Sequence, residues 1–252
     1  MGTVLKRIHV TEISVMSIFD CSARDVLTVC VFDEGRAGVE FLNWRIAALP
    51  MNERVRDAES FAGPGIYGLC FDDALIYIGS YLGVGSSAHP LSGDVVTSRW
   101  WAHIASITAR GHKVHVARTS IKALSAEFGD AHPLVSGLNG ASSPALLHKD
   151  AGCLSPLRRL RFAAERWDQF CGVKPSPDAL MGRFQFVYAH PRDLQHREDV
   201  VGLRSDIVAK ERELIGALAP ACNAAHVPRG QASVPVNLTD AKICLEEAVA
   251  DI

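Results

Sequence analysis

Two short apolar runs joined by two aspartates constrain the fold more than any other part of the sequence. Residues 63–83 read GPGIYGLCFDDALIYIGSYLG. The runs are rich in aromatic and β-branched residues, and the aspartates between them suit a turn, so we predict a β-hairpin. Glycine weakens a strand unless something approaches the backbone closely. Gly65, Gly68 and Gly79 therefore indicate a site beside this hairpin.

Size and composition set wider limits. The chain has 252 residues, of which 48% are hydrophobic, and it can bury a sizeable core in one large domain or two small ones. No apolar stretch approaches the roughly 18 residues of a membrane span. Residues 1–15 lack the layout of a secretion signal, so we expect a cytoplasmic protein. The seven cysteines form no CxxC pair and are odd in number, which argues against a disulfide framework or a zinc knuckle.

Apolar residues recur at helical spacing in two segments. The sequence predicts one helix over residues 98–110 and another over about 204–218. Thr97 or Ser98 would cap the first helix, and Gly111 would end it.

Charged side chains interrupt the apolar pattern of both helices. Glu211 falls inside the apolar stripe of the second helix, between Ile207 and Leu214. A carboxylate there is costly unless an arginine, hydrogen-bond donors or a metal ion neutralises it. The alternative is a glutamate at the edge of the stripe that bends out to water. Arg99 and His103 share one face of the first helix, where they could act together or form an exposed surface pair.

Two clusters of basic residues stand out against a formal net charge of −2. This charge argues against a surface coated in positive charge for indiscriminate binding of nucleic acid. The clusters lie in residues 109–118 and 154–167, and each could follow a phosphate backbone or be a solvated face. The candidate DNA contacts in them are Arg110, Lys113, Arg158, Arg159 and Arg161.

Several of these residues occur in an order that is typical of one family. Tyr67 and Tyr77 lie in the motifs GIY and YIG, ten residues apart, and the helix with an arginine and a histidine follows. The segment ERELIGALAPACN then contributes Glu211 and Asn223. The chain therefore resembles the GIY-YIG nucleases. The resemblance covers residues 64–80, 97–110 and 183–223, a little under a third of the chain.

The resemblance implies an α+β fold, with a small three-stranded antiparallel sheet flanked by helices in the order β-β-α-β-α. The catalytic core would occupy residues 61–225. Residues 1–60 would be an N-terminal extension packed on this core, and residues 226–252 a C-terminal tail. The segment at about 119–182, rich in Ser, Gly, Pro and Ala, is expected to be an insertion that decorates the core.

The resemblance also implies a divalent-metal-dependent DNA endonuclease that leaves 5′-phosphate and 3′-hydroxyl ends. The size of the chain and its insertion favour a sequence-specific, restriction-type member. Glu211 would hold one Mg²⁺ or Mn²⁺ ion. Arg99 would bind a non-bridging phosphate oxygen, and Asn223 would fix the helix end or Glu211 itself.

Two tyrosines and a histidine would handle protons in such a site. Tyr67 is the candidate general base, on the expectation that a nearby cation and Arg99 favour its phenolate. Tyr77 would position the water or donate to the phosphate. His103 would take the proton from Tyr67 or orient the water, and the sequence leaves both roles open.

One position departs from the family pattern. Many members carry a lysine directly after the second motif, where this chain has Ser80. A positive contact to the phosphate must then come from elsewhere or be absent, and Ser80 itself is a further candidate DNA contact. A homo-oligomer is compatible with the sequence.

Three other interpretations fit the sequence. The protein could be a structure-selective or single-strand nuclease of repair or of a mobile element. It could also be a non-catalytic DNA-binding module on the same fold. Finally, the motifs could be accidental in another α/β enzyme, in which case Glu211 and Tyr67 should lie far apart.

Overall fold

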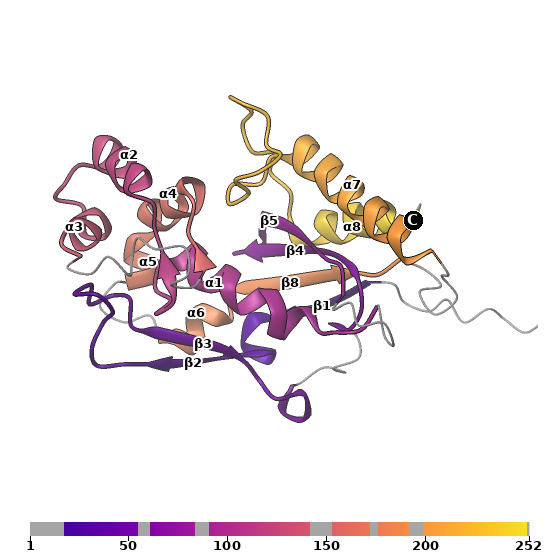
Figure 1. Ribbon diagram of the computed structural model, residues 1–252, viewed down its shortest axis with the longest axis horizontal. Helices are drawn as coiled ribbons and strands as arrows, with labels where there is room; N and C mark the ends of the chain where they lie inside the picture. Colours follow the sequence, from indigo (N-terminus) through magenta and orange to yellow (C-terminus); the bar gives the residue numbers. More distant parts are fainter. Residues whose placement is uncertain are drawn as a thin grey trace, which may run out of the picture.

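The computed structural model describes residues 18–54, 61–83, 91–141, 153–171, 176–191, 199–250 and 252. This part of the chain forms an α+β fold around a four-stranded antiparallel sheet with the strand order β1-β8-β4-β5 (Figure 1). Its strands are β1 (Ile18–Ser22), β4 (Gly65–Phe71), β5 (Ala74–Tyr81) and β8 (Phe184–Ala189). Two small sheets pair β2 (Leu27–Val31) with β3 (Trp44–Ala48) and β6 (Val114–His115) with β7 (Cys153–Leu154).

β4 and β5 form the predicted hairpin. Asp72 and Asp73 at its turn have φ angles of 48° and 67°. Positive φ at both central residues belongs to the two-residue turns that match strand twist, and aspartate tolerates it. A bulge beside Leu69 then shifts the register by one residue, so that Tyr77 lies opposite Leu69. Without the bulge Ile76 would lie there, and Tyr77 would point to the other face of the sheet.

Eight α-helices surround the sheets in the described residues. None of them is long and apolar enough to cross a membrane. They are α1 (Trp101–Thr108), α2 (Arg118–Phe128), α3 (Pro133–Asn139), α4 (Leu157–Glu165), α5 (Trp167–Cys171), α6 (Pro177–Met181), α7 (Val200–Leu218) and α8 (Leu238–Ala250).

The first predicted helix begins at Val96, before the caps expected at Thr97 or Ser98. The Asp94 carboxylate accepts a hydrogen bond of 3.0 Å from the backbone N–H of Val96. That residue opens a π-helical turn, Val96–Trp100, which continues into α1. Such turns are rare and occur often at functional sites.

Two other helix ends also differ from the expected positions. α1 ends at Thr108 because Ala109 takes a left-handed φ of 53°, so the predicted stop at Gly111 is wrong. α7 begins at residue 200, earlier than expected, because the Asp199 side chain accepts a hydrogen bond of 2.8 Å from the N–H of Gly202.

The central sheet buries both of its faces. One face carries Tyr67, Leu69 and Phe71 and packs against α1 and the helices of the insertion. The other face carries Ile66 and Ile78 and is covered by α7 and α8 (Figure 1). The alternation of side chains along β4 and β5 therefore produces two separate clusters of buried apolar residues.

The expected three-stranded sheet is wrong. β1 pairs with β8 along its whole length, so part of the segment 1–60 belongs to the central sheet. Its five residues, IFDCS, do not alternate clearly between apolar and polar, which is why the pattern did not reveal a strand. The expected C-terminal tail, residues 226–252, likewise contributes to the core. It includes α8, where Leu245 packs in the same apolar cluster as Ile66 and Ile78.

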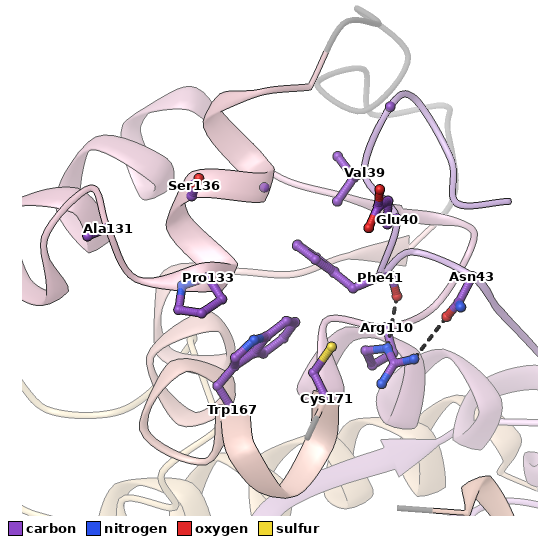
Figure 2. Close-up of a pocket in the computed structure, with 12 residues that line it drawn as sticks. Val39, Glu40, Phe41, Asn43, Arg110, Ala131, Pro133, Ser136, Trp167 and Cys171 are labelled. Atoms are coloured by element: carbon purple, nitrogen blue, oxygen red, sulfur yellow. Dashed lines mark hydrogen bonds between the residues drawn. The ribbon is translucent and has the colours of Figure 1, made fainter. Parts of the chain in front are cut away.

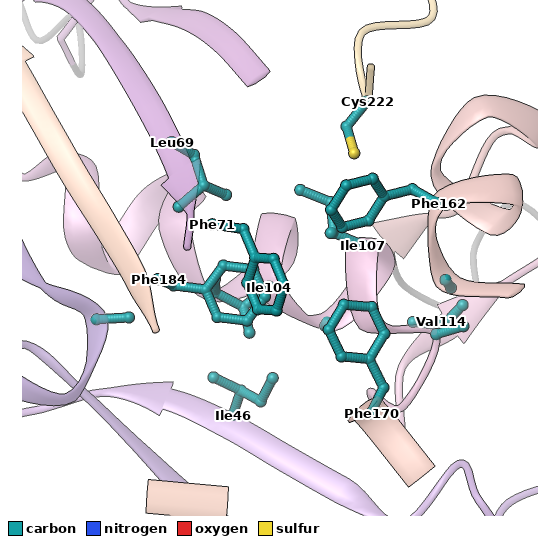
Figure 3. Packing of buried hydrophobic residues seen from close by; sticks show 14 of the residues in the cluster. Ile46, Leu69, Phe71, Ile104, Ile107, Val114, Phe162, Phe170, Phe184 and Cys222 are labelled. Carbon is teal, nitrogen blue, oxygen red and sulfur yellow. The ribbon is translucent and has the colours of Figure 1, made fainter. Parts of the chain in front are cut away.

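The described part of the insertion at 119–182 belongs to the core and does not merely decorate it. Phe162 and Phe170 are buried, and their ring centroids lie 5.9 and 5.4 Å from that of Phe71 on β4 (Figure 3). Phe184 on β8 joins the group, with its ring centroid 4.7 Å from that of Phe71. The insertion helices thus complete the core over one face of the sheet.

Replacing Phe170 by alanine is expected to lower the free energy of unfolding by about 3–5 kcal/mol, because the ring fills space between the insertion and the sheet. Asp168→Ala, at an exposed position on the same helix, is the control and should change it by less than about 0.5 kcal/mol. Urea unfolding measures both. A cost below about 1 kcal/mol for Phe170→Ala would mean that the insertion folds apart from the sheet.

Candidate active site

Tyr67 and His103 form the buried centre of the candidate site. The Tyr67 hydroxyl and the His103 Nε2 are hydrogen-bonded at 2.6 Å. Tyr67, on β4, is 2% exposed, and His103, on α1, is 8% exposed. The other ring nitrogen of His103, Nδ1, has no hydrogen-bond partner among the described residues. The contact with Tyr67 therefore anchors the imidazole.

Tyr77 joins this pair because the bulge in β5 turns it to the same face of the sheet. It is half-buried, and its ring centroid lies 4.4 Å from that of His103 and 6.2 Å from that of Tyr67. The structure thus brings the two predicted tyrosines and the predicted histidine into one cluster. We call these three residues the tyrosine cluster.

The hairpin glycines make room for side chains of the protein itself. A Cβ atom at Gly79 would lie 2.6 Å from both the Cζ and the hydroxyl oxygen of Tyr67. A Cβ atom at Gly65 would lie 2.4 Å from the carbonyl oxygen of Ala189 and 2.9 Å from the Tyr188 ring. The close approach expected from the sequence is present, but the groups that approach these two glycines are intramolecular.

Arg99 and Glu211 bring opposite charges to the tyrosine cluster. Arg99, on the π-helical turn, is exposed and forms no hydrogen bond or ion pair with the described residues. Glu211, on α7, is half-buried, and its Oε2 accepts a hydrogen bond of 2.6 Å from the Ser80 hydroxyl. Arg99 lowers the pKa of Tyr67 and of Tyr77, whereas Glu211 raises both. The charges of Arg99 and Glu211 therefore both act on the two tyrosines.

The site spans the edge strand β5. Tyr67 pairs with Gly79, so both lie on the face that α1 covers, whereas the neighbouring Ser80 pairs with Ile66 on the face that α7 covers. There Ser80 meets Glu211. Ser80, predicted as a DNA contact, instead orients this carboxylate.

Asn223 holds the edge strand and makes no hydrogen bond with Glu211. Its Oδ1 accepts from the N–H of Ile78 at 2.9 Å, and its Nδ2 donates to the carbonyl oxygen of the same residue at 2.7 Å. The preceding N–H, of Cys222, donates to the carbonyl oxygen of Ile76 at 2.8 Å. The chain that follows α7 therefore fixes β5 from its outer side.

Burial dominates the protonation states in the tyrosine cluster. It raises the pKa of Tyr67 well above the ordinary value of 10.0 and also raises that of Tyr77, despite nearby arginines. Burial, and then the charges of Arg159 and Arg99, lower the pKa of His103 well below 6.5. Arg99 thus acts on Tyr67 in the expected direction, but desolvation is larger and the phenolate is not favoured. Tyr67 and His103 are both neutral near neutral pH.

Arg110, predicted as a DNA contact, is an internal structural residue. Its guanidinium donates to the carbonyl oxygens of Phe41 and Phe170 and to Asn43 Oδ1, and it lies 4.4 Å from the centre of the Trp44 ring. Figure 2 shows these contacts to Phe41 and Asn43 at the base of a cleft of about 560 Å³. None of the predicted catalytic residues lines this cleft.

The basic cluster on α4 also makes internal contacts. Arg161 forms an ion pair of 2.6 Å with Glu127 on α2. Arg158 donates to the carbonyl oxygens of residues 220 and 221, just after α7. Lys113 is exposed. Of the predicted DNA contacts in the two basic clusters, Lys113 is therefore the most open to solvent.

Arg159 contacts the tyrosine cluster, and the sequence did not reveal this contact. Its guanidinium carbon lies 4.8 Å from the centre of the Tyr77 ring. The sequence placed Arg159 only in a basic helix, and helical periodicity contains no information about which strand that helix will meet. No local signal could have identified this contact.

Glu211, the predicted metal ligand, is in surroundings that fit a hydrated cation. Across the described ranges, no group of three or more His, Cys, Asp or Glu side chains is placed to hold a metal ion. Glu211 is half-exposed and has no ion pair with a described residue. One such carboxylate suits Mg²⁺, which keeps several waters and binds proteins through one or two carboxylates.

His103 is expected to make the fold less stable in acid. Its folded-state pKa lies below the value of 6.5, so the unfolded chain binds more protons as the pH falls below this value. Its stabilising contribution is present above pH 6.5 and is lost as the pH falls toward the folded-state pKa. His103→Gln should therefore lose less unfolding free energy between about pH 7 and pH 5, by up to about 1.4 kcal/mol per pH unit. Urea unfolding of both proteins across this pH range measures the difference. Parallel plots of the free energy of unfolding against pH would contradict the prediction.

Gly79→Ala is expected to lower the free energy of unfolding by about 1–3 kcal/mol, because the added methyl group overlaps the Tyr67 ring. Gly216→Ala on α7 is the matched control. Nothing lies within 4 Å of the Cβ that it adds, so it should be neutral or stabilise the helix by up to about 1 kcal/mol. Thermal or urea unfolding compares the variants, and equal effects would mean that Tyr67 can move aside freely.

Comparison of the chain with models of known protein families, with curated proteins and with solved structures finds no match. The resemblance to the GIY-YIG nucleases therefore rests on the motif residues themselves.

Proposed function

We propose that this chain is a divalent-metal-dependent DNA endonuclease of the GIY-YIG type. It would hydrolyse phosphodiester bonds at specific sequences and leave 5′-phosphate and 3′-hydroxyl ends. The observation that carries the proposal is the hydrogen-bonded pair of a phenol and an imidazole, together with a free guanidinium and a carboxylate whose charges act on that phenol. These groups come from separate segments, and the core elements follow the order β4-β5-α1-β8-α7. That is the β-β-α-β-α order expected of such a core.

Hydrolysis of a phosphodiester requires an activated water, stabilisation of charge on the phosphoryl oxygens and help for the departing 3′ oxygen. Tyr67 and His103 suit the first task as a pair. While the Tyr67 oxygen takes a proton from the attacking water, its own proton passes to Nε2 of the neutral imidazole. The phenol then never carries a full negative charge. The step does place a positive charge on the buried imidazole, which burial and the nearby arginines disfavour, and the negative charge that develops on the attacking oxygen and the phosphate would offset this cost. This role requires the His103 tautomer with its proton on Nδ1.

Arg99 and Tyr77 suit the second task. The Arg99 guanidinium is exposed and has no partner among the described residues, so its planar array of donors is available to a non-bridging phosphate oxygen. Tyr77 is half-buried and can donate its hydroxyl proton to the phosphate or to the water. Neither group needs to change its charge to do so.

Glu211 would hold one Mg²⁺ or Mn²⁺ ion. When bound, such an ion neutralises charge at the phosphate and at the leaving oxygen. The hydrogen bond from Ser80 fixes the orientation of the Glu211 carboxylate and leaves its other oxygen for a ligand. This role accounts for a carboxylate that lies within an apolar stripe and has no ion pair with a described residue.

The openness of the site favours a polymer as substrate. Arg99 is exposed and Glu211 is half-exposed, and the site residues do not line the cleft of about 560 Å³. A duplex could therefore lie across the edge of β5. Sequence specificity would depend on the insertion, which packs beside the tyrosine cluster through Arg159.

Glu211→Gln is expected to reduce the rate of DNA cleavage in Mg²⁺ by on the order of 100-fold or more, because it removes the charged metal ligand. Glu213→Gln is the control: this residue is exposed and pairs with Lys210 at 3.3 Å, and its loss should leave cleavage nearly unchanged. Both variants and the unchanged protein are incubated with plasmid and duplex DNA, with Mg²⁺ or with a chelator, and the ends are mapped.

The pattern of products separates the alternatives. Discrete fragments from duplex plasmid agree with a sequence-specific enzyme. Cleavage restricted to single strands or junctions would favour the structure-selective nuclease. DNA binding without cleavage, equal in both variants, would favour the non-catalytic module and refute the proposal.

A further inference from the structure

α4, which belongs to the insertion, holds Arg159 against the Tyr77 ring at 4.8 Å. Two hydrogen bonds fix the guanidinium there. Nη1 donates to Ser106 Oγ at 2.5 Å, and Nε donates to the carbonyl oxygen of Cys222 at 3.3 Å. Ser106 lies on the same helix as His103, and Cys222 lies in the segment that fixes β5. Arg159 therefore connects three of the elements that build the site.

No carboxylate of the described residues forms an ion pair with Arg159. Two other arginines of this region are paired, Arg161 with Glu127 and Arg166 with Glu165. The partners of Arg159 are instead a hydroxyl, a carbonyl oxygen and an aromatic face. Its positive charge is thus directed at the tyrosine cluster and is not neutralised by an acidic side chain there.

We propose that Arg159 is a positioning residue of this site and acts through Tyr77. It fixes the Tyr77 ring and, by placing positive charge over the face of the ring, strengthens the hydroxyl as a hydrogen-bond donor to a phosphate oxygen. The identity of that oxygen rests on the proposed nuclease function, whereas the effect on Tyr77 does not. The insertion then contributes to the chemistry, because it supplies the Arg159 guanidinium in addition to that of Arg99.

The physical basis is the attraction between a cation and the electron-rich face of an aromatic ring. A positive charge close to a phenol stabilises the phenolate and so makes the neutral hydroxyl a better donor. Arg159 has the largest effect among the charged groups around Tyr77 and lowers its pKa. Glu211 raises this pKa and the charge of Arg99 lowers it, while burial, the largest effect, keeps it above 10.0.

Arg158 provides a matched control on the same helix. It is half-buried, like Arg159, and donates to the carbonyl oxygens of residues 220 and 221. It therefore anchors the same segment after α7, but its charge is not among those that shift the pKa of Tyr77. Loosening of this segment should affect both variants, whereas loss of charge at the ring should affect only Arg159→Met.

The test is an NMR titration of metal-free protein labelled with ¹³C at the Cζ atoms of its four tyrosines. Tyr77 is assigned by the loss of its signal in Tyr77→Phe. In Arg159→Met we expect the acid dissociation constant of Tyr77 to fall about tenfold or more. Arg158→Met should change it by less than about threefold, and Arg159→Lys should restore most of it. Should Arg159→Met fail to fold, Arg159→Gln removes the charge while keeping a donor for Cys222.

An unchanged or increased dissociation constant of Tyr77 in the variant without charge would overturn the inference. An increase is the result of a purely structural role, because loosened packing would let water reach the phenol. DNA cleavage is the second readout, with an expected loss of roughly 10-fold to 100-fold in Arg159→Met. If the unchanged protein cleaves no DNA, the proposed function fails and the titration still decides the role of Arg159. If it cleaves DNA but the Tyr77 titration does not move, only this inference fails.

Discussion

The pairing register of β4 and β5 decides which side chains can meet at the candidate site. Successive residues of a strand point to opposite faces, so Tyr77 reaches Tyr67 only because the bulge beside Leu69 moves it by one position. Gly79 lies opposite Tyr67 and leaves the space that the phenol occupies. His103 on α1 then contacts Tyr67 on β4 and Tyr77 on β5. Without the bulge, Tyr77 would point into the apolar cluster under α7 and α8.

The interior of the site is neutral and its rim is charged. Tyr67 and His103 are almost fully buried, and burial holds both in their uncharged forms. Arg99 and Glu211 lie closer to solvent. A low-dielectric interior penalises net charge but strengthens hydrogen bonds, so it favours the neutral, hydrogen-bonded pair of Tyr67 and His103. Groups at the rim can meet a charged substrate without first being desolvated.

Short-range sequence patterns predicted the elements whose partners are close in the chain. The hairpin and its two-aspartate turn follow from propensity and turn chemistry, and the helix predicted over about 204–218 ends at Leu218 as expected. The first helix was misplaced because Asp94 caps it through a π-helical turn that no periodic pattern signals. β1 was missed because a short edge strand is recognised mainly by the strand that it joins.

The residue types of the candidate site could be selected from the sequence, but their protonation states could not. Order and spacing singled out Tyr67, His103 and Glu211, whereas the pKa of the first two depends on burial by helices far away in the chain. Arg110 and Arg159 looked alike as members of basic clusters. Only tertiary packing directs one to internal carbonyl oxygens and the other to the Tyr77 ring.

The segment that follows α7 also has a consequence for how copies of this protein behave together. β5 ends the central sheet, and the outward backbone groups of an end strand can recruit a strand from a neighbouring molecule. Here the side-chain amide of Asn223 imitates a peptide group against Ile78, and the backbone at Cys222 and Val236 occupies neighbouring positions. A strand that carries a tyrosine of the candidate site can thus lie near the surface without offering these backbone groups to a neighbouring molecule.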